Sequence, residues 1–166
     1  MAPGFEDPLG LLAACHERIA GHCVTLVRLA AHVRVHGGDR EAQVAARRVY
    51  DYFAEAGRWH HEDEERDLAP LLERYGDAGV RAAMARLMAE HRVLAEAYAP
   101  LAQALSLLAP APTELPIEPY VGLMQAHLAA ENREILPRAA TLLPTSAITA
   151  LGEAMAARRR LSRPAR

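Results

Sequence analysis

The 166-residue sequence has little of what membrane-spanning, secreted or sheet-rich proteins require. No apolar run is long enough to cross a bilayer, and the amino terminus has neither the basic start nor the apolar stretch of a secretory signal. Runs of β-branched residues are short, whereas alanine, leucine, arginine and glutamate dominate, which favours helices. We therefore expect one all-α domain in the cytoplasm, with no membrane partner.

Cysteine is also scarce. Cys15 and Cys23 are eight residues apart on one expected helix, which separates them by roughly 12 Å and is too far for a disulfide. We expect two free thiols that are buried as small apolar side chains, as is usual in a reducing compartment.

The net charge is −2, which indicates no nucleic-acid partner. Positive charge gathers at one place, because the last nine residues hold five arginines: Arg158, Arg159, Arg160, Arg163 and Arg166. The rest of the chain has 14 basic and 21 acidic residues and so a charge of −7. We interpret the basic tail as a solvated C-terminal end; contact with RNA or an acidic partner is the alternative.

Glycine and proline cluster at a few positions that divide the chain into helices. Asp7-Pro8 is a helix start, and the stretch from His36 to Asp39 ends one helix and caps the next. With further breaks near residues 76, 110 and 144, the pattern predicts helices over 8–36, 40–74, 77–108 and 117–143, with a short fifth helix over 146–160. Pro70, Pro100 and Pro137 should kink these helices or end them early.

Four amphipathic helices of similar length with short connections are typical of an antiparallel bundle. We predict an all-α fold, an up-down-up-down four-helix bundle with a short C-terminal fifth helix. Residues 1–144 form the bundle, and residues 145–166 form the short helix and the basic tail.

Each of the four long helices carries one histidine on its apolar stripe: His16, His60, His91 and His127. His16 and His60 each lie 22 residues from position 38 in the first turn, and His91 and His127 each lie 18 residues from position 109. Antiparallel packing therefore brings all four imidazoles to one layer, roughly 27–33 Å from those turns.

The second and fourth helices repeat one motif. His60 and His127 each begin H-x-x-x-E, followed by an aliphatic residue four positions after the glutamate and a proline six positions after it. This spacing places Glu64 and Glu131 one turn from the two imidazoles, on the inward face. Two buried carboxylates at one level are costly without a partner, and metal cations supply one.

The predicted ligands are His16, His60, Glu64, His91, His127 and Glu131. Six ligands are too many for one tetrahedral zinc ion, but they suit a dinuclear site in which each metal takes two histidines and the glutamates bridge. Nitrogen and oxygen ligands without thiolate fit iron or manganese, and affinity order alone also admits zinc or copper.

These residues resemble the hemerythrin-like (HHE cation-binding) domain family. The resemblance rests on "CHERI" with His16, on the segment from His60 to "DLAP", on "EHRVL" with His91, and on "HLAAENREILP", and it covers about residues 8–143. It implies a non-heme di-iron centre, two iron ions with an Fe–O–Fe or related bridge, inside a four-helix bundle.

The sequence departs from the oxygen-carrying members of that family at two places. Position 95 is Ala where those members have a second histidine one turn after the helix-three ligand, and Glu131 stands where they have an aspartate. The symmetric H-x-x-x-E pairs are more similar to bacterial members linked to iron–sulfur repair and to nitric oxide or oxygen sensing.

The resemblance implies a protein that binds or senses oxygen, nitric oxide or iron, with a small diatomic or oxygen-derived molecule as its partner. The alternative is a di-iron enzyme that reduces peroxide or nitric oxide, or that donates iron for cluster repair. A metal-free interaction bundle is a third possibility, which the buried glutamates oppose.

Several other residues near the motifs are candidates for the site. His61 and Glu65 form a second H-x-x-x-E pair, but their counterparts Leu128 and Asn132 cannot bind metal in the same way, so the repeat disfavours them. We interpret Glu62, Asp63 and Asp67 as solvated surface. His32 and His36 lie beside the first turn, too far from His16 to share its site. Tyr98, Tyr120 and Phe53 either line an access path or belong to the core.

Overall fold

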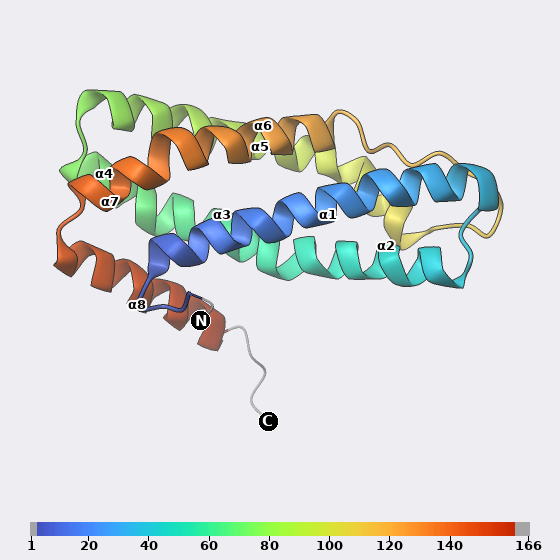
Figure 1. The fold of residues 1–166 in the computed structure, drawn as a ribbon, viewed down its shortest axis with the longest axis horizontal. Coiled ribbons are helices and arrows are strands. Elements are labelled where there is room, and N and C mark those ends of the chain that lie inside the picture. Colours follow the sequence, from blue (N-terminus) through green and yellow to red (C-terminus); the bar gives the residue numbers. More distant parts are fainter. Residues whose placement is uncertain (1–2, 162–166) are drawn as a thin grey trace.

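The computed structural model describes residues 3–161, which form helices joined by loops (Figure 1). The first and third bundle helices are α1 (Pro8–His36) and α5 (Ala78–Ser106). The second runs without a break through α2 (Arg40–Tyr52), the π-helical turn η1 (Phe53–Gly57), α3 (Arg58–Asp63), the π-helical turn η2 (Glu64–Leu68) and α4 (Ala69–Tyr75). The fourth consists of α6 (Tyr120–Ala130), the π-helical turn η3 (Glu131–Ile135) and α7 (Leu136–Leu142), and α8 (Thr145–Leu161) follows.

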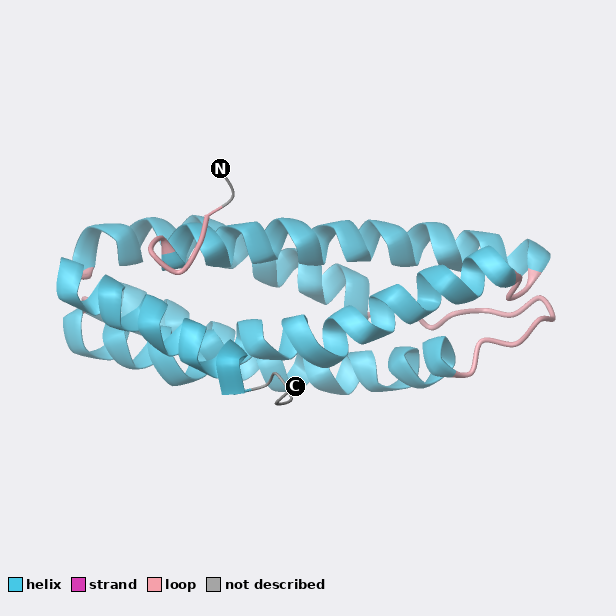
Figure 2. Ribbon diagram, turned by 90° about the horizontal axis from the view of Figure 1, so that it is seen from below, coloured by secondary structure: helices cyan, strands magenta, loops and turns pink. Residues whose placement is uncertain are grey.

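The four bundle helices lie side by side and alternate in direction (Figures 1 and 2). α1 packs against α2 and α6, and α5 packs against α2 and α6, which closes the ring. The predicted all-α bundle with a short fifth helix is therefore confirmed. Within residues 3–161, no helix combines the length and the apolar character that a membrane span requires.

The turn between α1 and α2 is built as its sequence predicts. Gly37 has a φ of 71°, and a Cβ there would lie 1.9 Å from the carbonyl oxygen of Pro110, so only glycine fits. Asp39 caps α2 by accepting a hydrogen bond of 2.8 Å from the backbone N–H of Ala42. The long loop after α5 is held to this turn by a hydrogen bond of 2.8 Å from Gly38 N–H to the carbonyl of Ala109.

None of the three internal prolines ends its helix. α5 continues past Pro100 to Ser106, while Pro70 and Pro137 each stand two residues after a π-helical turn. In η2 and η3 the residue before the proline donates its N–H to the carbonyl five positions earlier, which belongs to Glu64 and to Glu131 respectively. Proline cannot donate to the helix and crowds the carbonyl four residues back, and the wider turn absorbs both defects. The repeated Glu–Pro spacing thus produces the same local geometry twice.

The core consists of two apolar clusters that lie toward opposite ends of the bundle. One contains Ile19, Leu26, Val49, Leu94, Leu101 and Met124 among its buried side chains. The other contains Leu12, Leu68, Leu87, Ile135, Leu151 and Met155. On every bundle helix, the predicted ligands lie between a residue of one cluster and a residue of the other.

The fifth helix contributes to the second cluster. Ala147, Leu151 and Met155 of α8 are buried together with Leu12 of α1. α8 contacts α1 and α3, and in Figure 1 it lies along the end of the bundle near the amino terminus. The division of the chain at residue 144 stays a prediction.

The interpretation of Asp63 as solvated surface is wrong. Its side chain is fully buried, and Arg159 Nη2 lies 2.7 Å from Asp63 Oδ2. Arg158 also donates to Asp63, and its Nη2 lies 2.6 Å from Asp67 Oδ2. The reason is that α8 folds back along α3 and η2, so these two arginines are not a solvated tail. Burial raises the pKa of Asp63 in spite of both arginines.

Glu62 also belongs to this cluster of charges, because its Oε2 lies 3.4 Å from Arg158 Nε. Arg160 is exposed and lies outside the cluster. Arg163 and Arg166 lie outside the described residues. The predicted free thiols are confirmed, because Cys15 and Cys23 are buried and unpaired.

Replacing both Arg158 and Arg159 by Ala should lower the free energy of unfolding by about 3 kcal/mol, because a buried carboxylate then loses its cations. Urea denaturation measures the change. Arg160→Ala on the same helix is the control and should stay within about 0.5 kcal/mol of the parent chain. An equal effect of the double and control variants would show that the ion pairs contribute nothing to stability.

Candidate metal centre

The structure brings the six predicted ligands together. They come from the middle of α1 (His16), from α3 (His60), from the first residue of η2 (Glu64), from α5 (His91), from α6 (His127) and from the first residue of η3 (Glu131). Five of them are at most 2% exposed and His91 is 5% exposed. They form one polar layer between the two apolar clusters, and this layer is the candidate metal centre.

The Glu64 carboxylate faces histidines of both expected pairs, His16 with His60 and His91 with His127. Its Oε1 lies 3.3 Å from His60 Nε2 and 3.6 Å from His16 Nε2, while its Oε2 lies 3.3 Å from His91 Nε2. Two ligand atoms that share one cation at about 2.1 Å lie about 3.0–3.5 Å apart, so these separations suit a metal between them. One oxygen toward each pair is the arrangement that a bridging carboxylate needs.

Glu131 lies across the layer from Glu64. Its Oε2 is 3.3 Å from His16 Nε2 and 3.5 Å from His127 Nε2, and it therefore also touches one histidine of each pair. The chain thus supplies two carboxylates, each between imidazoles that belong to different helices.

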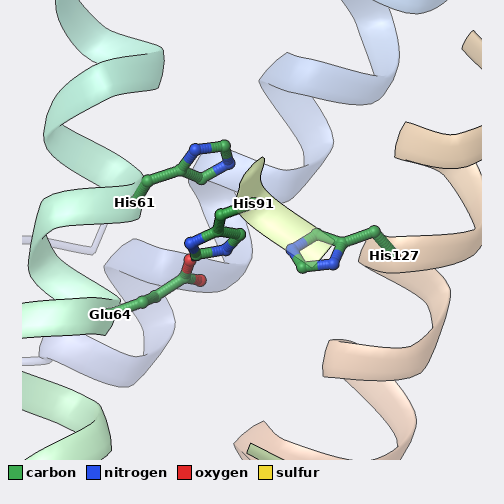
Figure 3. Close-up of side chains that lie close together, drawn as sticks. All are labelled: His61, Glu64, His91 and His127. Atoms are coloured by element: carbon green, nitrogen blue, oxygen red, sulfur yellow. The ribbon is translucent and has the colours of Figure 1, made fainter. Parts of the chain in front are cut away.

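Two overlapping groups have ligand atoms that all lie within 4.8 Å of one another. The first consists of His16, His60, Glu64 and Glu131, and the second of His61, Glu64, His91 and His127. Glu64 is common to both groups. Figure 3 shows the second group, with His61 and Glu64 extending from one helix toward His91 and with His127 on another helix.

His61 is the member that the sequence repeat disfavoured. Its ring stacks on His91, with the centroids 3.9 Å apart and an interplanar angle of 12°. Its counterpart Leu128 packs into the apolar core, so the two H-x-x-x-E helices are not equivalent here. The sequence contains one signal for His61 as a ligand. Position 95 is alanine where the oxygen-carrying members have a histidine, and His61 supplies a third imidazole to the second group.

Three residues orient the imidazoles from behind. His16 Nδ1 lies 2.7 Å from Asn132 Oδ1, His91 Nδ1 lies 2.7 Å from Glu65 Oε1, and His127 Nδ1 lies 2.9 Å from Glu90 Oε2. An amide oxygen and an ionised carboxylate only accept hydrogen bonds, so each Nδ1 donates and each Nε2 faces the layer. Sequence reasoning missed Glu90 and Asn132, and it had considered Glu65 only as a ligand.

The inward atoms of the layer lack hydrogen-bond partners within residues 3–161. Among residues 3–161, the buried side-chain atoms that lack a hydrogen-bond partner include His16 Nε2, both ring nitrogens of His60, Glu64 Oε2, His91 Nε2, His127 Nε2 and Glu131 Oε2. Such atoms are rare in folded proteins, because each costs free energy. Their concentration in one layer, at separations suited to a shared cation, shows that these residues fit a metal site.

The acid–base properties of the layer conflict without a cation. Burial, together with the neighbouring Glu64, raises the pKa of Glu131 to about 7. Burial also lowers the pKa of His60 to about 4. Burial opposes the charging of His16 too, but Glu131 and Glu64 outweigh it and raise its pKa to about 10. Burial raises the pKa of Glu64, but His60 and the other histidines outweigh this and hold it well below its usual range. Without a cation, charged and neutral imidazoles and carboxylates are therefore buried side by side.

A cavity of about 550 Å³ reaches the second group from outside the bundle. His61 and His91 line it, as do Phe53, Tyr98 and Tyr120. These three aromatic residues thus lie where the access-path alternative requires. His32 lies apart from the layer, with its Nε2 2.8 Å from Asp39 Oδ2 beside the first turn, as expected.

A four-helix bundle with two overlapping groups of buried imidazole and carboxylate ligands defines a cation-binding helical protein. Residues 7–139 match the model of the hemerythrin HHE cation-binding domain, and the chain therefore belongs to that family. It is also similar to a protein of Haemophilus influenzae described as an uncharacterized protein. The identity is 25% over 161 residues, which cover 95% of this chain and 92% of that protein.

Glu90→Ala should lower the affinity of the chain for metal about 10- to 100-fold, because His127 loses the acceptor that fixes its ring. Competition with a metal-binding dye measures the affinity. Glu96→Ala is the matched control on α5, since exposed Glu96 pairs with Arg92 at 3.2 Å and lies away from the layer. Equal affinities of the two variants would contradict the assigned role of Glu90.

Proposed function

We propose that the chain holds two iron ions in the polar layer and uses them to bind or sense oxygen, nitric oxide or another small oxygen-derived ligand. The observation that carries the proposal is the set of buried, partnerless ligand atoms around Glu64, whose two oxygens face different histidines. The two groups that share Glu64 supply four ligands each, enough for two ions but excessive for one.

The donor atoms favour iron among the available metals. The two groups offer imidazole nitrogen and carboxylate oxygen and no thiolate, which fits iron or manganese, with zinc as a competitor. When bound, two redox-active cations supply electrons and open coordination positions for a small ligand. The chain itself orients the imidazoles, places one carboxylate oxygen toward each pair and keeps bulk water from a layer that is at most 5% exposed.

The second group gives this chain its own version of the family site. Three imidazoles converge there, and His61 from α3 stands close to His91 while position 95 is alanine. Replacement of an α5 ligand by an α3 ligand leaves one flank of the group open to the cavity. This favours ligand sensing or turnover over the reversible oxygen carriage of the members that have a second histidine one turn after the third-helix ligand.

We place the protein in the cytoplasm, which suits its two free thiols.

Optical spectroscopy of anaerobically reduced, iron-loaded protein tests the proposal. A visible absorption band that forms on adding oxygen or nitric oxide and reverses on removing the gas supports binding or sensing. Continuous consumption of peroxide or nitric oxide with a reductant supports the enzyme alternative. Unchanged spectra of fully loaded protein would contradict both.

Protein expressed with iron should contain about two ions per chain. His61→Ala should reduce this to about one, because the second group falls from four ligands to three while the first keeps all four. Glu64→Ala should reduce it further, because both groups lose a ligand. Elemental analysis of gel-filtered protein measures the content. His36→Ala, which alters an exposed histidine outside the layer, is the control and should keep two ions. Full metal content in Glu64→Ala would sink the dinuclear assignment.

Removing the metal with a chelator should lower the melting temperature by about 10 °C. A ligand at a thousandfold excess over its Kd adds about 4 kcal/mol, and each kcal/mol shifts a domain of this size by about 2–4 °C. Differential scanning calorimetry measures the shift, and hydrogen exchange should show lost protection around His16, His60, His91 and His127. The Glu64→Ala variant should show no such metal-dependent shift. Equal melting of loaded and metal-free parent chains would mean that the layer is stable without cations.

A further inference from the structure

The cavity beside the second group is larger than a diatomic ligand needs. Its volume of about 550 Å³ lies in the range of about 300–1,000 Å³ that is usual for sites of organic molecules. A single water takes a share of only about 30 Å³ in the liquid. The space therefore suits an organic molecule, and a channel for gas alone leaves most of it unexplained.

The inner wall is apolar and aromatic. Phe53 lies with its ring centroid 5.1 Å from that of Tyr98 and 5.6 Å from that of Tyr120, and all three rings line the cavity. Met124 adds a polarisable side chain to this wall, and Met88 lines the cavity where it packs against the second core cluster. Offset and edge-on ring contacts of this kind accept a further aromatic ring.

The outer part is charged, with an excess of arginine. Arg58, Arg66 and Arg92 line the cavity and are exposed, against the two carboxylates of Glu62 and Glu65. Glu62 Oε1 is engaged by Arg58 Nη1 at 2.7 Å, and Glu65 Oε1 by His91 Nδ1 at 2.7 Å. The arginines are paired as well, since Arg58 and Arg66 both lie beside Glu62 and Arg92 pairs with Glu96 at 3.2 Å. Three arginines against two lining carboxylates leave an excess of one positive charge, which favours an anion over a cation.

The floor carries ligands of one group only. His61 and His91 of the second group line the cavity. Glu64 and His127 of that group do not, nor do the ligands of the first group. A cation held by the second group would face the cavity on the flank where Ala95 stands in place of an imidazole. A carboxylate oxygen entering from this side would add an oxygen ligand to such a cation.

We propose that this cavity binds a small aromatic carboxylate, with the ring against Phe53, Tyr98 and Tyr120 and the carboxylate directed at the His61–His91 flank of the metal centre. The inference rests on the proposed function, since it assigns the organic ligand of that same site. The protein then responds to an organic acid as well as to a small gas.

Two variants on α5 separate the cavity from the neighbouring surface. Ala95→Trp places an indole at the lining of the cavity, while Val93→Trp places the same side chain on an exposed position two residues earlier that does not line it. Neither residue belongs to the proposed metal ligands, so both variants should keep their metal.

Benzoate titration of the zinc-loaded chain tests the inference, with methionine methyl resonances as the readout. Met88 and Met124 line the cavity, whereas Met155 is fully buried and is not among the lining residues, so it serves as an internal reference. Benzoate should shift the Met88 and Met124 methyls saturably and leave Met155 unchanged. Ala95→Trp should weaken binding at least about tenfold, Val93→Trp should not, and removing zinc should weaken it about tenfold, as loss of a charged contact does.

Zinc content of the same samples keeps the two proposals apart. A chain that holds about two zinc ions and shows no benzoate shift, or equal shifts at Met155, overturns the inference and leaves the metal site intact. Benzoate affinity that is the same with and without zinc overturns the assigned direction of the carboxylate. A folded chain that takes up no zinc or iron contradicts the proposed function itself.

Discussion

The burial of the Glu64 and Glu131 carboxylates among imidazoles is the interaction on which the rest of the structure depends. Both residues are 1% exposed, and the layer that contains them lies between two apolar clusters. The inward atoms lack hydrogen bonds within the described chain. Protonation does not remove the conflict, because the raised pKa values of Glu131 and His16 favour protons on both groups, while other imidazoles of the layer stay neutral. Cations resolve this conflict, since they bind both kinds of donor at once. Stability and function therefore have the same origin in this bundle.

The backbone is adapted to the layer at the two glutamates. Each is the first residue of a π-helical turn, and each turn is followed by a proline that an ordinary helix would not accept so easily. The extra residue in the turn changes the helical register between the ligand and the apolar residues beyond it. Glu64 and Leu68 at the two ends of one turn are both buried, as are Glu131 and Ile135 in the other. Further out, the buried pairing of Asp63 with Arg158 and Arg159 attaches α8 to the helix that carries His60, His61 and Glu64.

Much of this arrangement is predictable from local sequence. Helix ends follow from caps such as Asp39 and from Gly37, whose positive φ leaves no alternative residue. The layer follows from helical periodicity and from the symmetry of antiparallel helices about their turns, which is why His16 and His60 meet. The π-helical turns were not predicted, because periodicity assumes a constant 3.6 residues per turn. Asp63 was misjudged because its burial depends on where α8 folds back, and Glu90 was missed because its partner His127 is on another helix. His61 is disfavoured from sequence because the repeat implies that the two H-x-x-x-E helices are equivalent, whereas His61 lies beside His91 and its counterpart Leu128 lies in the core.

X-ray absorption at the iron K edge tests the central claim most directly, because it reports what surrounds each ion in the loaded protein. The account predicts a first shell of nitrogen and oxygen with the multiple-scattering pattern of imidazole, and a second iron at about 3.5–4 Å. Isolated iron ions without a metal neighbour, or a first shell that contains sulfur from Cys15 or Cys23, would contradict it.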